Sequence, residues 1–385
     1  MLSRFHPTQI LLFGGFLSSL GSLVYLLKQL QTFAQLQVSI AAIGSYVFFT
    51  RGATFLSGIF ASQIVDNVSG RKILLWTEIL GALCTVAMFF SWKESSSGLG
   101  IFIFWASLRA AFTNIHAGSR TKILAIYGQN TRSKISGDIL WLNRLTHGVF
   151  LFAAVFLWVF DSLTLKEAIL LDGASFVING LLLWKLPEVS LQHLSDENKG
   201  FQSLKNLIRF GGYWAWADFL AAFCMAGLVM FMVRVSQDHP ENIYLVYAIY
   251  GMSVWLSSSV QKRISLKLWF FVSWFLMISG YFAISQSEEL VAKNLFFSIL
   301  CVGYWGVYNV ISTRLQLLSP KSLNAGINTA RMTIMLAILV SGEFVFGTIL
   351  TQHTLKAESL FRASATLIAV IILGWSFRRA RETSH

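Results

Sequence analysis

The chain has 385 residues, of which 55% are hydrophobic and 12% are charged, and its mean hydropathy is +0.62. Such a composition has too few polar side chains to cover a water-facing surface, so it excludes a soluble globular fold. The formal charge of +12 does not indicate nucleic-acid binding, because membrane proteins gather Lys and Arg in the loops that stay in the cytoplasm.

Apolar runs long enough to span a bilayer core recur along the whole chain. We expect twelve membrane-spanning helices, at residues 8–27, 38–63, 73–91, 99–119, 135–158, 167–185, 210–233, 242–260, 266–285, 291–312, 325–349 and 359–377. No small-residue cleavage site follows the first run, so we expect an uncleaved helix rather than a signal peptide. The four prolines fall at expected helix ends or in loops, which predicts continuous helices.

The distribution of basic residues predicts the orientation of these helices. With both termini in the cytoplasm, about 19 of the 30 Lys and Arg residues lie on the cytoplasmic side and about seven outside. The tail residues Arg378, Arg379 and Arg381 would then meet lipid headgroups. We expect a multi-pass protein of the bacterial cytoplasmic (inner) membrane with both termini in the cytoplasm.

A long polar stretch divides the expected helices into two sets of six. We expect an N-terminal six-helix bundle at residues 1–186, a cytoplasmic linker at 187–209, and a C-terminal six-helix bundle at 210–385 that ends in a short basic tail. The two halves share weak internal similarity. A shift of about 195 residues places Asn114 on Asn309, and a shift of 194 places Arg120 on Arg314. The sequence thus predicts an all-α polytopic membrane protein of two pseudo-symmetric six-helix bundles.

The loop between the second and third expected helices carries a motif. It reads Ser62-x-x-x-Asp66-Asn67-Val68-Ser69-Gly70-Arg71-Lys72. This resembles the loop signature of the major facilitator superfamily, G-x-x-x-D-R-x-G-R-R, although Ser62 and Asn67 depart from it and one extra residue precedes Gly70. In that family the aspartate caps a neighbouring helix and holds the cytoplasmic gate with the arginine. The resemblance implies a gating role for Asp66 and Arg71, whereas the alternative is a basic loop with one solvated Asp.

In length and short loops the chain resembles the efflux branch of that superfamily, which includes macrolide and siderophore exporters. One feature departs from the drug antiporters of the superfamily. They carry a glycine and proline pattern on the fifth helix, and residues 135–160 contain no proline. Proton-coupled drug antiport is therefore less well supported than the fold.

Arginines at membrane depth are the main functional candidates, because an ionised side chain in the bilayer is costly unless it meets a partner or water. Arg51, Arg109 and Arg144 lie about 13, 10 and 9 residues into their expected helices, which places them near the midplane. A guanidinium offers a planar fork to carboxylates and phosphates, so the three predict an anion-binding site. The alternative is pairing with acids. The acids within the expected spans are Glu78, Asp172, Asp218 and Glu343, and none is expected at the midplane.

Helix periodicity groups further polar residues. Arg109, Thr113, His116 and Arg120 share one face of the fourth helix, which we expect to line the aqueous pathway. Proton coupling needs a group that changes charge near neutral pH, such as a buried carboxylate or a histidine. The predicted substrate-binding residues are Arg51, Arg109, Thr113, Arg144, His147, Tyr304 and Tyr308; the gating residues are Asp66, Arg71, Arg120 and Arg331; the proton-coupling residues are Asp218 and Glu343. Packing within the bundle is the alternative role for each.

These features predict a secondary active transporter that exports a small anionic or amphiphilic metabolite, such as a siderophore or drug, by alternating access coupled to protons. The alternatives are an uptake symporter for a carboxylated nutrient, a membrane-embedded enzyme, and a channel or receptor. An enzyme would need a catalytic motif, and the sequence has no HExxH, GxSxG or Walker A motif. We expect no enzymatic activity, cofactor or metal, and we expect a monomer whose partners are the lipid bilayer, protons and the substrate.

Overall fold

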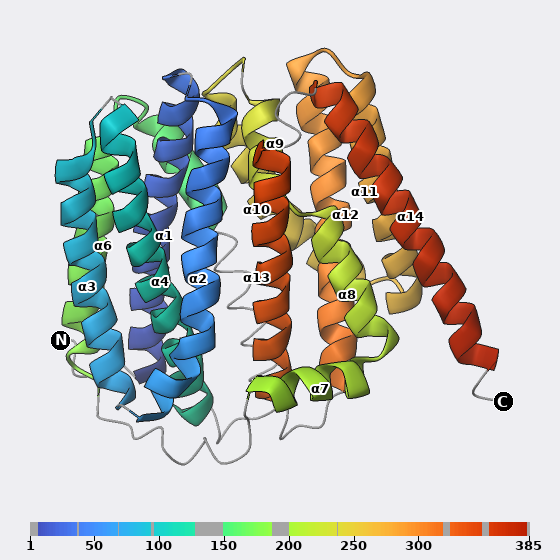
Figure 1. The fold of residues 1–385 in the computed structure, drawn as a ribbon, viewed down its shortest axis with the longest axis horizontal. Helices are drawn as coiled ribbons and strands as arrows, with labels where there is room; N and C mark the ends of the chain where they lie inside the picture. Colours follow the sequence, from blue (N-terminus) through green and yellow to red (C-terminus); the bar gives the residue numbers. More distant parts are fainter. Residues whose placement is uncertain are drawn as a thin grey trace. The chain divides into compact units, whose positions relative to one another are not determined.

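The structure is a computed structural model that describes residues 7–36, 38–67, 69–93, 96–127, 149–186, 200–236, 238–318, 324–348 and 354–382. In these ranges every regular element is an α-helix (Figure 1). The helices are α1 (Pro7–Gln35), α2 (Ile40–Asn67), α3 (Gly70–Ser91), α4 (Ser96–Tyr127), α6 (Leu165–Leu183), α7 (Gly200–Gly211), α8 (Tyr213–Cys224), α9 (Leu228–Val235), α10 (Asn242–Gln261), α11 (Leu266–Gln286), α12 (Leu290–Leu318), α13 (Asn324–Thr348) and α14 (Leu355–Glu382). A short apolar helix also covers Val149–Val159. The predicted all-α class is confirmed.

Eight stretches of the described chain are helical, long and apolar enough to cross a membrane. They lie in α1, α3, α4, the α8 and α9 pair, α10, α11, α12 and α14. Large apolar side chains on their surfaces are exposed, including Phe90 and Val291, which are 74% and 79% exposed. In water such surfaces would promote association, whereas in a bilayer they contact lipid.

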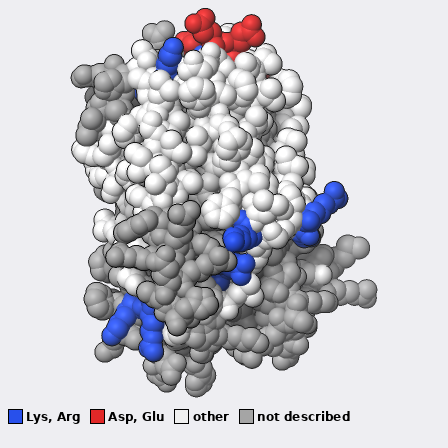
Figure 2. Space-filling model, turned by 90° about the vertical axis from the view of Figure 1, so that its right-hand side faces the viewer, with Lys and Arg blue, Asp and Glu red and all other residues white. Residues whose placement is uncertain are grey.

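Charged side chains are unevenly placed on the face shown in Figure 2. Most of the Lys and Arg visible there lie in the lower half, Asp and Glu gather at the upper end, and a broad band of uncharged side chains separates them. An uncharged band between two polar ends is the pattern expected of a protein embedded in a bilayer.

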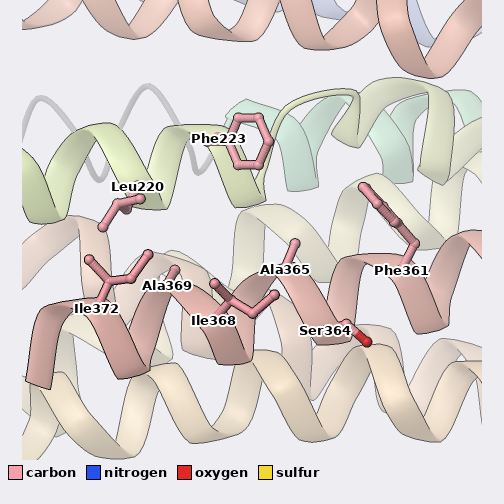
Figure 3. A pocket seen from close by; sticks show the side chains of 8 residues that line it. All are labelled: Leu220, Phe223, Phe361, Ser364, Ala365, Ile368, Ala369 and Ile372. Carbon is pink, nitrogen blue, oxygen red and sulfur yellow. The ribbon is translucent and has the colours of Figure 1, made fainter.

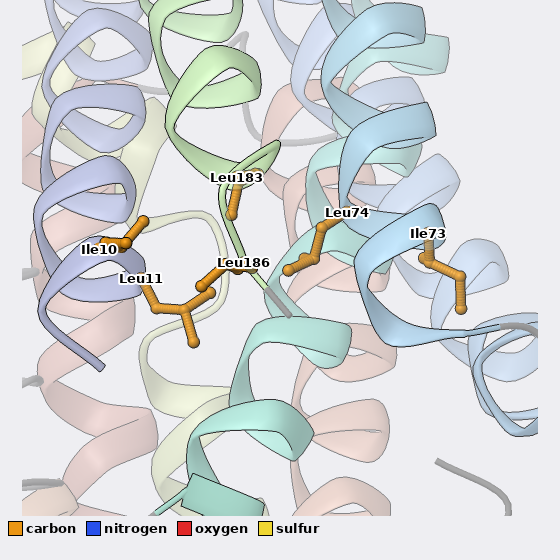
Figure 4. Close-up of a cluster of buried hydrophobic side chains, with 6 residues drawn as sticks. All are labelled: Ile10, Leu11, Ile73, Leu74, Leu183 and Leu186. Carbon is orange, nitrogen blue, oxygen red and sulfur yellow. The ribbon is translucent and has the colours of Figure 1, made fainter. Parts of the chain in front are cut away.

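The chain divides into two compact units. The N-terminal unit comprises Met1–Leu36 and Tyr46–Glu197, and the C-terminal unit comprises Gln37–Ser45 and Asn198–His385. In the N-terminal unit α1 packs on α6, and α3 packs on both α4 and α6. A cluster of buried apolar side chains joins α1, α3 and the end of α6 (Figure 4). Its members are Ile10, Leu11, Ile73, Leu74, Leu183 and Leu186.

In the C-terminal unit α11 and α12 approach each other closely, while α10 packs on α12 and α14 packs on α11 and α8. Gly303 on α12 permits the approach, because a Cβ atom there would lie 2.6 Å from the carbonyl oxygen of Ser273 and 2.8 Å from the amide nitrogen of Met277. Gly280 on α11 plays the same part against Leu300. Small residues at helix contacts let the backbones meet, which is how membrane helices gain packing energy.

The first helix is longer than its apolar run. The prediction ended it at residue 27, before a polar segment, and the structure continues α1 to Gln35. The polar side chains Lys28, Gln29 and Gln31 of this segment are buried, and Lys28 Nζ donates to the carbonyl oxygen of Asp161 at 3.1 Å. The prediction was wrong because tertiary contacts, which hydropathy does not report, let polar residues extend a membrane helix.

The seventh expected span is broken, contrary to the prediction of continuous helices. α8 ends at Cys224 and α9 begins at Leu228. Gly227, at the start of α9, has a φ of 71°, a left-handed conformation that interrupts a right-handed helix without any proline. In addition, the predicted linker at 187–209 is partly helical, since α7 occupies Gly200–Gly211 and contacts α13. Figure 1 shows α7 running across the end of α13.

Candidate functional site

Arg109 of α4 is held in a buried ion pair by Asp172 of α6. Its Nε donates to Asp172 Oδ2 at 2.6 Å, and its Nη2 lies 2.5 Å from the same oxygen. Ser22 of α1 closes the arrangement, since its hydroxyl accepts from Arg109 Nη2 at 2.8 Å and donates to Asp172 Oδ1 at 3.0 Å. The guanidinium lies 4.9 Å and 5.3 Å from the ring centres of Tyr25 and Phe176. Three helices of the N-terminal unit therefore meet at one charge pair.

This pair corrects the expectation that no acid lies at the depth of the arginines. Asp172 is fully buried and lies about two turns into α6, which spans 19 residues, and so sits near the middle of that helix. The prediction began this helix two residues later and compared depths along separate helices. Such counting does not include the tilt and stagger of packed helices, so it placed Asp172 too far towards the outside.

A second polar cluster in the N-terminal unit surrounds Glu78 of α3. Asn179 of α6 donates through Nδ2 to Glu78 Oε1 at 2.7 Å, and His116 Nδ1 of α4 lies 3.1 Å from the same oxygen. The hydroxyl of Thr77 lies 3.1 Å from His116 Nδ1. All four side chains are buried. We call these residues the Glu78 cluster.

The polar face of α4 meets neighbouring helices within the N-terminal unit. Arg109 and His116 are buried there, against α6 and α3, and their place on the aqueous pathway stays a prediction. Thr113 donates its hydroxyl hydrogen to the carbonyl oxygen of Arg109 at 3.0 Å, within its own helix. Arg120 lies against Gly15 of α1. Sequence periodicity grouped these residues correctly on one face, and three neighbouring helices, α1, α3 and α6, contact that face.

The C-terminal unit contains a comparable buried pair. Arg331 of α13 binds Asp218 of α8 through two parallel hydrogen bonds, Nε to Oδ2 at 2.6 Å and Nη2 to Oδ1 at 2.8 Å. Its Nη1 donates to Ser312 Oγ of α12 at 2.7 Å, and its guanidinium lies 4.8 Å from the ring centre of Tyr308. The predicted gating arginine and the predicted proton-coupling aspartate are therefore partners.

Aromatic side chains gather beside this pair. The ring of Tyr250 on α10 stacks on Tyr304 of α12 with centroids 6.4 Å apart, and Trp305 lies 5.2 Å from Tyr250 and 5.4 Å from Tyr308. These four residues, which we call the aromatic cluster, come from two neighbouring helices. The sequence identified Tyr304 and Tyr308 as an aromatic wall, and Tyr250 completes the cluster from α10.

A further charged network stabilises the break between α8 and α9. Arg362 of α14 donates from Nη1 to the carbonyl oxygen of Ala226 at 2.6 Å and from Nη2 to that of Gly227 at 3.1 Å. Glu358, one turn earlier on α14, accepts from Arg362 Nη2 at 2.8 Å and from Arg234 Nη1 of α9 at 2.5 Å. Sequence reasoning missed this network. An available signal was the Glu358 and Arg362 pair, spaced four residues apart at the start of an apolar helix.

The remaining predicted site residues are placed as follows. Arg51 lies on α2 and is partly exposed, and the Arg71 guanidinium lies 5.9 Å from the ring centre of Trp184. Arg144 and His147 lie outside the described residues, and so do the side chains of Asp66 on α2 and Glu343 on α13. Functional roles for all of these residues stay predictions.

A groove of about 300 Å³ lies between α8 and α14 (Figure 3). Its lining is apolar apart from one hydroxyl and comprises Leu220, Phe223, Phe361, Ser364, Ala365, Ile368, Ala369 and Ile372. Because Phe361 and Ile368 are also at least half exposed on the outer surface of α14, we assign this groove to the lipid-facing surface. Among the described residues no group of three or more His, Cys, Asp or Glu side chains could hold a metal ion.

No protein-family model matches the chain, and no curated protein matches it by sequence. Solved structures share its fold. A mutant of the nucleoside transporter NupG superposes with a TM-score of 0.75 at 14% identity, over 97% of this chain and 100% of that one. A D-xylose-proton symporter gives 0.74 at 11% identity, over 95% and 96%. The human organic anion transporter MFSD10 (TETRAN) gives 0.67 at 12% identity, over 95% and 98%. The chain therefore has the fold of these membrane transporters along nearly its whole length.

Proposed function

We propose that this chain is a secondary active transporter that exports a small anionic or amphiphilic metabolite across the bacterial cytoplasmic membrane, by alternating access coupled to the proton gradient. The observation that carries the transport function is the fold, which is shared with a nucleoside transporter, a sugar-proton symporter and an organic anion transporter over at least 95% of the chain. Nothing in the fold favours catalysis, and transport by two six-helix halves needs no catalytic group.

The substrate class is proposed from the chemistry of the two units. Each unit holds one arginine in a buried pair with an aspartate, and such charges are kept at membrane depth at a cost in free energy. An anionic substrate group can replace the aspartate as the partner of Arg109, because a guanidinium binds any planar oxyanion with the same fork. Tyr304 and Tyr308 of the aromatic cluster supply ring faces for the apolar part of the substrate, and their hydroxyl groups can hydrogen-bond to its polar groups.

Topology and direction follow from the charge pattern and the family resemblance. Both termini and the linker at residues 187–209 are placed in the cytoplasm, a placement supported by the basic end of the face in Figure 2. Outward transport rests on the resemblance to the efflux branch in length and short loops. The cytoplasmic gate is assigned to Asp66, Arg71 and Arg120, on the basis of the loop signature.

Protonation is proposed to act by releasing an arginine. In the C-terminal unit, a proton on Asp218 would cancel the charge that holds Arg331. Glu343 on α13 is proposed as a second proton-coupling residue. Because Arg331 also contacts the ring of Tyr308, its release would alter the aromatic cluster. This gives a physical link between proton uptake and substrate affinity.

Ligand-dependent thermal stability of the purified protein tests the substrate class. The probes are 2,3-dihydroxybenzoate and its neutral counterpart catechol, which differ by one carboxylate. We expect the anion alone to raise the unfolding temperature, and we expect Tyr304→Ala to reduce that increase. Phe90→Ala, at an aromatic residue 74% exposed on α3, is the matched control and should behave as the wild type. Equal stabilisation by both probes, or by neither, would contradict an anionic aromatic substrate.

A further inference from the structure

In the Glu78 cluster, one oxygen of the buried carboxylate accepts no hydrogen bond from the described residues. Glu78 Oε1 is contacted by Asn179 and His116, whereas Glu78 Oε2 is buried and has no hydrogen-bond partner among the described residues. A buried carboxylate oxygen without a donor is unfavourable, and adding a proton to it removes the charge of the buried carboxylate. Asp218 and Asp172 differ in this respect, because both oxygens of each accept hydrogen bonds.

The hydrogen bonds of Thr77 indicate which ring nitrogen of His116 carries the hydrogen. The Thr77 hydroxyl lies 2.9 Å from the carbonyl oxygens of both Ile73 and Leu74, so its single hydrogen is donated to the backbone. It can then only accept from His116, and we assign the ring hydrogen to Nδ1. The Nδ1 hydrogen points at the Thr77 and Glu78 oxygens, and in the neutral ring the lone pair lies on Nε2.

The charges around the cluster come from α4 and α6. On α4, Arg120 and Arg109 act on Glu78 together with His116, and on α6 the charged group is Asp172, already paired with Arg109. α1 faces the cluster with Gly14 and Gly15, which lie against Asn179 and Arg120. Among the described residues, Glu78 is the acid whose charge acts on Arg120. Protonation of Glu78 removes that negative charge.

We infer that Glu78 and His116 form a proton-binding site inside the N-terminal unit, which takes up one proton and releases it again. The proton is received by the free oxygen of Glu78, and the His116 ring, which donates to the other oxygen, sets how tightly it is held. Uptake neutralises the carboxylate and weakens its attraction for Arg120, whose guanidinium then attracts an anion more strongly. Proton binding stands on the cluster alone, whereas its use in coupling rests on the proposed transport function.

Infrared difference spectra of the purified protein, recorded while the pH is lowered, test this site. A protonated carboxyl group in an apolar environment gives its own carbonyl stretching band. We expect this band in the wild type and its loss in Glu78→Gln, which keeps the shape and the acceptor for Asn179. Glu241→Gln, at an exposed glutamate before α10, is the control and should retain the band. A band of unchanged size in Glu78→Gln would overturn the inference.

A second variant covers the case in which Glu78→Gln does not fold. Thr77→Val removes one acceptor of the His116 hydrogen but leaves the carboxylate, so the midpoint of the band should move to another pH. His116→Gln should move it as well. Unchanged midpoints in both variants would show that the histidine has no part in the site. If the band behaves as expected but no probe anion crosses proteoliposome membranes, the proposed function fails and the proton site remains.

Discussion

The buried pair of Arg109 and Asp172 predicts a specific pattern of stabilities. In Asp172→Asn the guanidinium keeps its charge at a position only 8% exposed, without the carboxylate that accepts from its Nε and Nη2. Removing one partner of a buried ion pair costs about 3–5 kcal/mol. The ratio of folded to unfolded protein should therefore fall by roughly two to four orders of magnitude. Arg109→Gln should be destabilised to a similar degree, because Asp172 is then left as an unpaired buried charge.

The double variant Arg109→Gln/Asp172→Asn removes both charges and leaves two amides that can hydrogen-bond to each other. Its destabilisation should be smaller than the sum of the single variants by at least about 2 kcal/mol. Reversible unfolding in mixed detergent micelles measures the three free energies. Arg263→Gln, at an exposed arginine between α10 and α11, serves as control and should lie within about 0.5 kcal/mol of the wild type. Additive effects of the two single variants would refute the reasoning that the pair acts as one unit.

Three further predictions concern packing, backbone conformation and topology. Gly303→Ala should cost about 1–3 kcal/mol of unfolding free energy, because its Cβ would meet the α11 backbone, whereas Gly100→Ala, with no atom within 4 Å, should be tolerated. Gly227→Ala should cost about 1–2 kcal/mol because of its φ of 71°, while Gly173→Ala within α6 should be neutral or stabilising. Thermal unfolding of the two variants in each pair measures these differences in stability. Equal stability of the two variants in a pair would contradict the geometry. A cysteine introduced at Asn198 should not react with an impermeant maleimide added outside intact cells, because the linker is predicted to be cytoplasmic. Labelling would show that the linker lies outside the cell and would contradict the predicted topology.

The internal repeat shows how far sequence comparison could reach. A shift of about 195 residues aligned Asn114 with Asn309 on the basis of few identities. The structure gives both residues the same contact: Asn114 Nδ2 donates to Ser57 Oγ at 3.1 Å, and Asn309 Nδ2 donates to Ser257 Oγ at 3.5 Å. Helix positions were predictable because apolar length follows from bilayer thickness. The repeat was detectable because the two halves carry this asparagine on corresponding helices, α4 and α12.

The partners of the charged residues could not be predicted in the same way. Arg109 was recognised by its depth, but Asp172 lies 63 residues away in sequence and meets it because α4 and α6 both pack on α1 and α3. Glu78 was noted as an acid within a span, yet its contacts with His116 and Asn179 depend on three helices at once. Hydropathy also gave no sign of the break at Gly227, since the residues on both sides are apolar.

Proton movement driven by an anion gradient is the most direct test of proton-coupled export. Proteoliposomes are loaded with 2,3-dihydroxybenzoate and a pH-sensitive dye, and are then diluted into buffer without the anion. Antiport predicts that outflow of the anion drives protons inwards, so the internal pH falls faster than in protein-free liposomes. Passive leakage of the protonated acid, or symport, removes protons and raises the internal pH. A fall in internal pH that requires the protein would support the proposal, and a rise, or no difference from protein-free liposomes, would contradict it.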